Sequence, residues 1–309
     1  MFPTVFEIFG EPVSSYFSLL LVGFALATMF AARRARATGL DREVMIDLGL
    51  YSLIWGVLGG RALHVIADGQ FTNYVYSCID PSKVAWQIAE EQCAAIPGIW
   101  DEAAQVCHAA ERNCFAMFAF WQGGLAYYGG LIAALAFGLH FMRKERFPVG
   151  KGADFVACGI ALGLFFGRMG CFFGGCCFGS PTDSVFGLSF PPNSPASEVQ
   201  WREGTLPSMH HASLPVHPTQ LYEALGCLAL SAILFLVVEP RKRFDGQVML
   251  VFLAAYSALR FGIEFLRADD RGAVLGLSTS QWISVAVTAL VVVAWRRLAR
   301  AGLPAAVPA

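Results

Sequence analysis

Long apolar stretches separated by polar segments dominate the pattern of this chain. Seven of them are long enough to cross the hydrocarbon core of a bilayer, which takes about 20 helical residues. The pattern predicts an all-α polytopic membrane protein of about seven transmembrane helices, forming a single transmembrane domain over residues 1–309. The predicted spans are residues 13–32, 44–67, 115–142, 152–170, 218–238, 247–266 and 280–295.

The third stretch is longer than one span requires and contains the glycine pairs Gly123-Gly124 and Gly129-Gly130. Irregular backbone persists at membrane depth only where protein buries it or where it lines a cavity. We therefore expect residues 115–142 to begin with an irregular or re-entrant piece.

The composition agrees with a membrane location. Hydrophobic residues make up 56% of the chain and charged residues 15%, whereas about a quarter of a soluble domain is charged. The net charge of −1 indicates no particular partner, and no nucleic-acid-binding signature is present. The first 12 residues contain no Lys or Arg, so we expect the first apolar stretch to be a retained anchor rather than a signal peptide.

Basic residues are concentrated on one side of the predicted spans. The segments after spans one, three, five and seven contain 14 Lys and Arg residues, and the segments on the other side contain five. Cytoplasmic loops of membrane proteins are enriched in Lys and Arg. We therefore expect the N-terminus outside and the C-terminus in the cytoplasm.

Three further arginines lie inside the predicted spans or at their outer rim, namely Arg61, Arg168 and Arg260. Charged side chains are costly at membrane depth and often mark functional sites there. Glu264 lies one helical turn after Arg260 and is its candidate partner. Two interpretations are open. Each arginine could be a structural residue paired with a carboxylate, or the three together could accept an anion from outside the protein. Because Glu264 is the only clear acidic partner for three arginines, the sequence favours the anion site.

Arg168 begins a glycine-rich turn, residues 167–179, which also holds Cys171, Cys176 and Cys177. An arginine beside backbone that a ligand can approach closely suits a lipid phosphate. Alternatively, Arg168 extends to the membrane interface and the glycines only end the helix. The three cysteines have three open interpretations: compact residues at helix contacts, a disulfide within the loop, or a metal or redox-active thiol site.

Two polar segments on the outer side are long. Residues 68–114 form a cysteine-containing insertion, and residues 171–216 form a proline-rich loop that is a candidate lid, with His210 and His211 expected to be solvated. Thiols outside the membrane commonly form disulfides, and four of them allow three pairings. The insertion contains no Cys-x-x-Cys pair, which makes a zinc site there the weaker interpretation. We therefore expect two disulfides among Cys78, Cys93, Cys107 and Cys114.

The run His-Pro-Thr-Gln-Leu-Tyr-Glu at residues 217–223 leads into the fifth span. Its proline suits the first turn of a helix. A lone His217 would be more typical of a helix cap than of a catalyst. Gln220, Tyr222 and Glu223 add three polar side chains at the outer end of the same helix, which favours a site.

Together these motifs resemble the bacterial prolipoprotein diacylglyceryl transferases. The matches cover most of the chain outside the two long outer segments, and the most specific are the run 217–223 and Gly167-Arg168-x-Gly170. The other matches are Tyr16, Leu21-Val22-Gly23-Phe24, Gly59-Gly60-Arg61, Trp121-Gln122-Gly123-Gly124-Leu125, Gly129-Gly130-Leu131 and Arg260-x-x-x-Glu264-Phe265-x-Arg267.

The resemblance implies an enzyme that transfers the diacylglyceryl group of phosphatidylglycerol to the lipobox cysteine thiol of a prolipoprotein and releases glycerol phosphate. It implies no metal and no organic cofactor. The implied partners are phosphatidylglycerol, prolipoprotein signal peptides and the bilayer, without nucleic acid. The implied location is the bacterial cytoplasmic (inner) membrane.

The resemblance also implies roles for individual residues. Arg168 and Arg260 hold the phosphate, because negative charge develops on this leaving group. Glu264 orients Arg260. His217 and Tyr128 are the candidates for handling the proton of the thiol. The expected lipid-binding residues are Tyr16, Arg61, Gly123, Gly124, Gly129, Gly130, Gly170, Gln220 and Tyr222.

Three positions depart from the pattern that the resemblance implies. Tyr128 stands where the family usually has histidine, Cys171 where it has asparagine, and Cys176 where it has glutamate. Tyrosine has a pKa of about 10, against about 6.5 for histidine, so Tyr128 acts as a base only if an arginine lowers its pKa. The alternatives to a transferase are a non-catalytic phosphatidylglycerol-binding protein of the same fold and a membrane thiol–disulfide protein.

Overall fold

The structure is a computed structural model that describes residues 4–8, 11–67, 71–86, 90, 93, 98–120, 124–267 and 273–300. The chain divides into two compact units. The first unit comprises Met1–Ile46 and Phe147–Ala309, and the second comprises Asp47–Arg146. Six helices among the described residues are long and apolar enough to cross a membrane, which confirms the expected helical, polytopic membrane protein.

The predicted spans correspond closely to these helices. They are α1 (Ser15–Ala37), α2 (Arg42–Ala67), α6 (Val149–Gly174), α8 (Thr219–Ile233) with its continuation through Leu234–Val238 to Glu239–Arg241, α9 (Gln247–Glu264) and α10 (Thr279–Arg300). The remaining predicted span, residues 115–142, contains a 3-10 turn at Ala116–Phe118 and then α5 (Tyr127–Lys144). Its irregular start is confirmed, but the count of seven is not, because α5 includes glycines and charged residues that lower its hydropathy.

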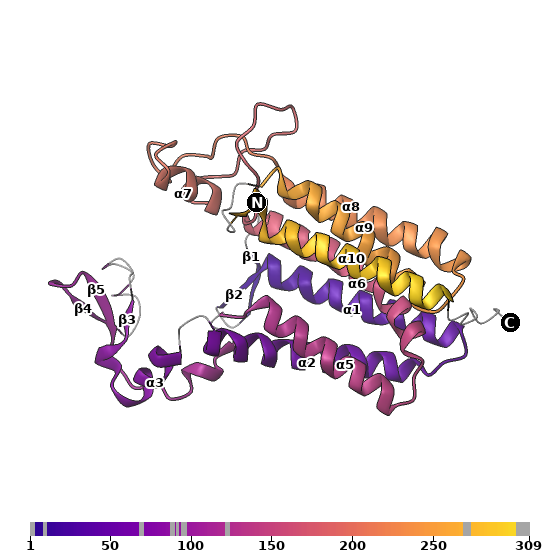
Figure 1. Ribbon diagram of the computed structural model, residues 1–309. Helices are drawn as coiled ribbons and strands as arrows, with labels where there is room; N and C mark the ends of the chain where they lie inside the picture. The colour runs from indigo at the N-terminus through magenta and orange to yellow at the C-terminus, as the bar shows by residue number, and fades with distance from the viewer. Residues whose placement is uncertain are drawn as a thin grey trace. The chain divides into compact units, whose positions relative to one another are not determined.

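In the first unit, α6 is the central helix. It packs against α1, α8 and α9, and α10 packs on α9 (Figure 1). Small residues permit the close approach: a Cβ on Gly159 would lie 3.0 Å from the carbonyl oxygen of Ala27 in α1. Such contacts matter because lipid provides no hydrophobic force between helices. The core between α6, α8 and α9 consists of Ala157, Cys158, Ala161, Leu230, Leu234, Val248 and Phe252.

Buried ion pairs connect the helices of the first unit near the start of α6. Asp154 of α6 is fully buried, accepts hydrogen bonds from three backbone N–H groups at the start of α9, and pairs with Lys242 at 3.0 Å. Its carboxylate therefore caps α9 and complements the dipole of that helix. Arg34 of α1 forms a further ion pair with Glu239 at the same end.

Two short antiparallel hairpins precede helices of the first unit. The strands β1 (Thr4–Ile8) and β2 (Glu11–Ser14) precede α1, and β6 (Ala273–Val274) and β7 (Leu277–Ser278) precede α10. Ser14 caps α1, because its hydroxyl accepts a hydrogen bond from the backbone N–H of Phe17 at 3.2 Å.

In the second unit, α2 and α5 pack through glycines. A Cβ on Gly59 would lie 2.5 Å from the carbonyl oxygen of Gly129, and a Cβ on Gly130 would lie 2.8 Å from that of Gly56. These positions have no room for a side chain, so glycine at 129 and 130 is required for the helix contact itself.

The insertion at residues 68–114 contains the disulfides Cys78–Cys114 and Cys93–Cys107. The two expected bridges are confirmed, and one of the three possible pairings is selected. The insertion also contains elements that the sequence did not predict, because its strands are too short to show alternation. These are α3 (Phe71–Ile79), a 3-10 turn (Pro81–Lys83) and an antiparallel sheet ordered β3 (Ala85–Trp86), β5 (Val106–Ala109), β4 (Gly98–Asp101).

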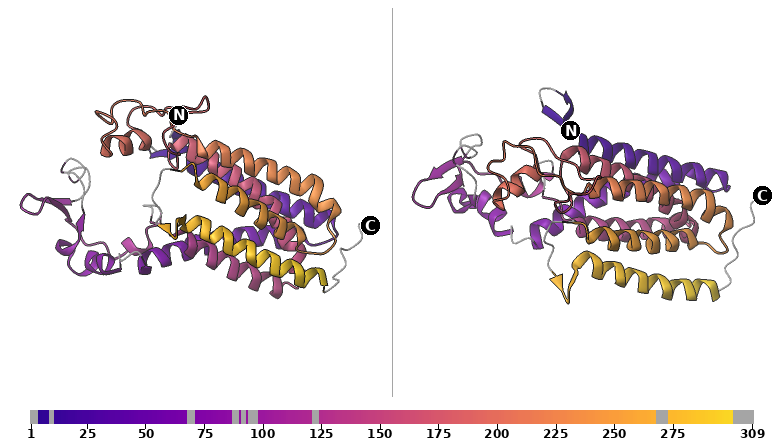
Figure 2. Two further views of the ribbon diagram at one scale, coloured as in Figure 1. Left: turned by 45° about the horizontal axis from the view of Figure 1, so that its top comes forward. Right: turned by 90° about the horizontal axis from the view of Figure 1, so that it is seen from above.

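The proline-rich loop, residues 171–216, is more ordered than its composition suggests. It contains α7 (Pro195–Arg202) and a small core of Phe190, Ala196 and Val216. In all views this segment lies at the end of the first unit where α6 finishes and α8 begins (Figure 1, Figure 2). His210 is exposed, as expected, and its Nδ1 lies 2.8 Å from Asn193. The lid function stays a prediction.

Candidate active site

Arg168 of α6 and Glu223 of α8 form the central ion pair of the candidate site. Arg168 Nε lies 3.0 Å from Glu223 Oε2. The hydroxyl of Tyr256 in α9 donates a hydrogen bond to Glu223 Oε1 at 2.9 Å. Glu223 is fully buried. The pair therefore joins three helices in a setting where an unpaired charge is costly.

Arg260 and Glu264 form a second ion pair, one turn apart on α9. Arg260 Nη2 lies 2.6 Å from Glu264 Oε2 and 3.4 Å from Ser280 Oγ. Ser278 donates a hydrogen bond to Glu264 Oε1 at 2.8 Å. Within the described ranges, Arg260 Nη1 is buried and has no hydrogen-bond partner. The expected partner of Arg260 is therefore present, and one charged donor remains unsatisfied.

The two ion pairs are electrostatically linked. Tyr256, which bonds to Glu223, lies one turn before Arg260 on α9. The charges of Glu223, Arg168 and Arg267 all act on Arg260. Three guanidinium groups thus share the neighbourhood of two carboxylates, so the cluster has an excess of positive charge.

A turn with strained backbone follows α6. Gly175 (φ 72°) and Cys177 (φ 63°) both adopt the left-handed conformation, which is unfavourable for a residue with a Cβ. Two side chains from the start of α8 hold this turn. Thr219 Oγ1 donates to the carbonyl oxygen of Cys177 and Gln220 Nε2 to that of Cys176, both at 2.8 Å.

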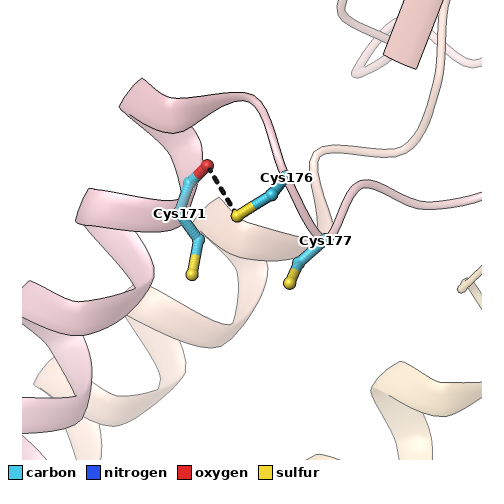
Figure 3. Close-up of side chains that lie close together, drawn as sticks. All are labelled: Cys171, Cys176 and Cys177. Carbon is cyan, nitrogen blue, oxygen red and sulfur yellow. Dashed lines mark hydrogen bonds between the residues drawn. The ribbon is translucent and has the colours of Figure 1, made fainter. Parts of the chain in front are cut away.

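The turn brings three cysteines together (Figure 3). The Sγ atoms of Cys171, Cys176 and Cys177 all lie within 4.8 Å of one another, and none of these residues is in a disulfide. Cys176 Sγ lies 3.7 Å from the carbonyl oxygen of Cys171 (Figure 3). Hydrogen bonds with the other two thiols, together with the guanidinium of Arg267, lower the pKa of Cys177.

Several expected site residues lie at the same end of the first unit. His217 Nδ1 lies 3.4 Å from the hydroxyl of Tyr222. Gln220 is buried, and its Oε1 has no hydrogen-bond partner in the part of the chain that the structure describes. Tyr16 packs on Gly170 so closely that a Cβ on this glycine would lie 3.0 Å from Tyr16 Cα.

The other expected site residues belong to the second unit. Arg61 donates hydrogen bonds to the backbone carbonyls of Ala116, Met117 and Gly124, at 2.6, 2.8 and 3.2 Å. It therefore ties α2 to the described backbone that precedes α5. Gly124 (φ 69°) adopts the left-handed conformation that is strained for a residue with a Cβ, and a Cβ there would require the ring of His64 and the guanidinium of Arg61 to shift. Tyr128 is half exposed at the start of α5, and Gly123 lies outside the described residues.

Sequence reasoning did not assign site roles to Glu223, Tyr256, Ser278 or Arg267. Glu223 was noted only as part of a polar run, and its pairing with Arg168 joins residues far apart in the chain. The spacing of Tyr256 could have indicated its role, because it lies one turn before Arg260 on the same helix face. Nothing in the sequence indicates the role of Ser278, since its contact with Glu264 depends on the hairpin before α10.

Fold and site together define a multi-pass helical membrane protein with a polar, doubly ion-paired site at one end of its first unit. Residues 3–297 match the family described as prolipoprotein diacylglyceryl transferase, and the chain belongs to this family, which confirms the expected resemblance.

Relatives with curated names cover nearly the whole chain. A phosphatidylglycerol–prolipoprotein diacylglyceryl transferase of Clostridium tetani is 28% identical over 92% of this chain and 93% of its own length. The phosphatidylglycerol–prolipoprotein diacylglyceryl transferase 2 of Clostridium perfringens is 30% identical over 90% of this chain and 88% of its own length. The corresponding transferase of Bordetella parapertussis is 30% identical over 92% of this chain and 90% of its own length.

Replacing Glu223 by Gln is expected to destabilise the protein by about 3 kcal/mol, because it leaves Arg168 without its buried counter-charge. The matched control is Glu198→Gln, which breaks an exposed pair with Arg202 on α7 and is expected to cost less than about 1 kcal/mol. Thermal unfolding of the detergent-solubilised chain measures both. Equal melting temperatures for the two variants would contradict the structural role of Glu223.

Proposed function

We propose that this chain transfers the diacylglyceryl group of phosphatidylglycerol to the lipobox cysteine thiol of a prolipoprotein and releases glycerol phosphate. Family membership over residues 3–297 supports this activity. So do the names of the relatives, which specify phosphatidylglycerol and prolipoprotein.

The observation that carries the proposal is the unsatisfied guanidinium of Arg260. Its Nη2 is paired with Glu264, whereas Nη1 is buried without a partner among the described residues. A buried charged donor without an acceptor costs free energy. The oxygen of a lipid phosphate at Nη1 would remove that cost, which suits a ligand that arrives through the bilayer.

Arg168 is the second phosphate-binding group of the proposal. Its contact with Glu223 is made through Nε, so the two terminal nitrogens lie outside this contact. When glycerol phosphate leaves, the phosphodiester monoanion becomes a monoester that gains negative charge. Two guanidinium groups stabilise this charge more in the transition state than in the bound lipid, which is how they accelerate the transfer.

The remaining residues of this end take supporting roles in the proposal. Glu264 orients Arg260, and His217 acts as a base or orients the thiol that must lose its proton. Tyr16, Gly170, Gln220 and Tyr222 bind the lipid, with Gln220 Oε1 available as an acceptor for a glycerol hydroxyl. Arg61, Gly123, Gly124, Gly129 and Gly130, which belong to the second unit, are the further lipid-binding residues of the proposal.

We further propose that the protein lies in the bacterial inner membrane with its N-terminus outside. In the first unit, Arg34 and Lys242 pair with Glu239 and with Asp154 near the start of α6, whereas Arg168 lies in the last turns of α6 and α7 follows it in the chain. This distribution supports a cytoplasmic location for the Asp154 end. Prolipoprotein signal peptides and phosphatidylglycerol then meet at the outer leaflet.

Reporter fusions test this orientation. A fusion within residues 143–151 is expected to report the cytoplasm, and a fusion within residues 68–114 the exterior. The two fusions control for each other, because each reporter must be active in one position and silent in the other. The reverse pattern would place the candidate site at the cytoplasmic face and overturn the orientation.

Arg168→Lys is expected to lower the transfer rate by about 100-fold, the order of magnitude for losing one preorganised donor. An ammonium group cannot direct paired donors at phosphate oxygens. Arg202→Lys, at an exposed arginine of α7, is the control and should leave the rate unchanged. The assay is the mass increase on the cysteine of a lipobox peptide in phosphatidylglycerol-containing membranes. An Arg168→Lys variant with the wild-type rate would refute the phosphate-binding role.

Tyr128→Phe is expected to reduce the rate, because we propose that the phenol positions thiol or lipid where the resemblance expects histidine. Tyr128→His should preserve or raise the rate. Tyr127→Phe, at the exposed neighbouring tyrosine, serves as control. If neither wild type nor Tyr128→His converts the peptide, while phosphatidylglycerol binds in an Arg168-dependent manner, the non-catalytic lipid-binding alternative is correct.

A further inference from the structure

The three thiols at the end of α6 are not accounted for by the phosphate site. Cys171 is buried in the last turn of α6, and Cys176 and Cys177 are half-buried in the turn that follows. Their side chains approach one another from two sides (Figure 3). In the part of the chain that the structure describes, no fourth His, Cys, Asp or Glu joins this group.

The turn is built so that these thiols converge. Left-handed backbone at Gly175 and Cys177 reverses the chain toward Cys171. The conformation at Cys177 persists because Thr219 and the guanidinium of Arg267 hold its carbonyl oxygen, at 2.8 and 3.4 Å. Strain of this kind is maintained where the surrounding structure fixes it. The thiol cluster is therefore supported from the start of α8 and the end of α9.

We propose that Cys171, Cys176 and Cys177 bind one Zn²⁺ ion, and that its fourth coordination position takes the thiolate of the lipobox cysteine. Metal binding follows from the thiol cluster alone, whereas the role of the fourth position rests on the proposed transferase function.

The geometry suits a catalytic zinc site. Such sites have three protein ligands and one open position. Zn–S bonds of about 2.3 Å in a tetrahedron place the sulfurs about 3.8 Å apart, so the widest pair, at most 4.8 Å apart here, must approach by only about 1 Å. The partial exposure of Cys176 and Cys177 leaves a side from which a peptide thiol can enter.

The surrounding charge also suits the metal. Zinc with three thiolates carries one net negative charge. Arg168 lies one turn before Cys171 on the same face of α6, with Cβ atoms about 5–6 Å apart, and Arg267 contacts the turn itself. These guanidinium groups offset the negative charge that metal-bound thiolates bring to a site at membrane depth.

The chemistry of the proposed reaction requires a thiolate next to the phosphate. Coordination to zinc releases the thiol proton to water. The sulfur then forms a bond to the carbon of the diacylglyceryl group that carries the phosphate. The carbon–oxygen bond breaks, and its electron pair leaves with the oxygen of glycerol phosphate. The neutral thioether dissociates from zinc, which returns unchanged.

Zinc coordination would also explain why the departures from the family pattern occur together. This chain has Tyr128 where a histidine is expected, and cysteines at 171 and 176 where asparagine and glutamate are expected. Tyrosine is a poor base near neutral pH. A metal that deprotonates the substrate thiol makes a histidine base at that position unnecessary.

The first test is metal content of the purified full-length chain in detergent, measured by mass spectrometry after dialysis against zinc. We expect one zinc per chain, and Co²⁺ in its place should give thiolate-to-metal charge-transfer absorption. Cys171→Ser, Cys176→Ser and Cys177→Ser should each lower zinc affinity at least about 10-fold. Cys227→Ala, at a buried thiol of α8 outside the cluster, should leave it unchanged.

A measurement on the unmodified chain guards against variants that fail to fold. Zinc should protect Cys176 and Cys177 from alkylation, and a chelator should remove that protection. Absence of bound zinc in reduced protein, or a disulfide between two of the three cysteines in protein isolated without reductant, would overturn the proposal.

The second test concerns the fourth position. A lipobox peptide added to the Co²⁺ form should strengthen the charge-transfer band, and the same peptide with serine in place of its cysteine should not. Transfer activity that survives complete zinc removal would overturn the proposed role of the fourth position while leaving the transferase function intact. Stoichiometric zinc without any transfer activity would refute the transferase function and the role of the fourth position, but not the metal site.

Discussion

Buried carboxylates at the two ends of α6 fix the arrangement of the first unit. Asp154 binds the start of α9 and Lys242, and Glu223 joins Arg168 to Tyr256. Because lipid is as apolar as the helix surfaces, burial alone does not hold transmembrane helices in register. Unpaired charge at these positions is costly. Sliding of α6 against α8 breaks the Arg168–Glu223 pair, and sliding of α6 against α9 breaks the contacts of Asp154.

The fold followed from the sequence where the signal was local. Hydropathy located the helices to within a few residues, because a span needs a long apolar run whatever its neighbours are. Residues 115–142 begin irregularly, as the glycine pairs indicated: α5 starts only at Tyr127, and Arg61 donates hydrogen bonds to backbone carbonyls of Ala116 and Met117. The number of disulfides followed from the location of the cysteines, whereas their pairing depended on the sheet of β3, β5 and β4.

The same division between local and distant contacts applies to the site. Arg260 and Glu264 are four residues apart on one helix, so their pairing was predictable. Arg168 and Glu223 lie on different helices, and no periodicity relates them. The thiol cluster was left open for a similar reason: the residues that stabilise its left-handed turn, Thr219 and Arg267, come from the start of α8 and the end of α9.

The position of Cys171 relative to Arg168 links the two halves of the proposed chemistry. Alkylation of a thiol by a phospholipid requires a guanidinium on the phosphate and a sulfur within about 3–3.5 Å of the adjacent glycerol carbon. That carbon is one oxygen away from phosphorus. A helix places residues i and i+3 on the same face, so α6 alone sets the phosphate-binding Arg168 beside Cys171, one of the three proposed zinc ligands. The lipobox sulfur in the fourth position would then lie next to the phosphate. Glu223 contacts Arg168 through Nε, so the terminal nitrogens of Arg168 lie outside this contact. In the proposal, the ion pair that joins α6 to α8 therefore also orients the phosphate-binding group beside the zinc ligands.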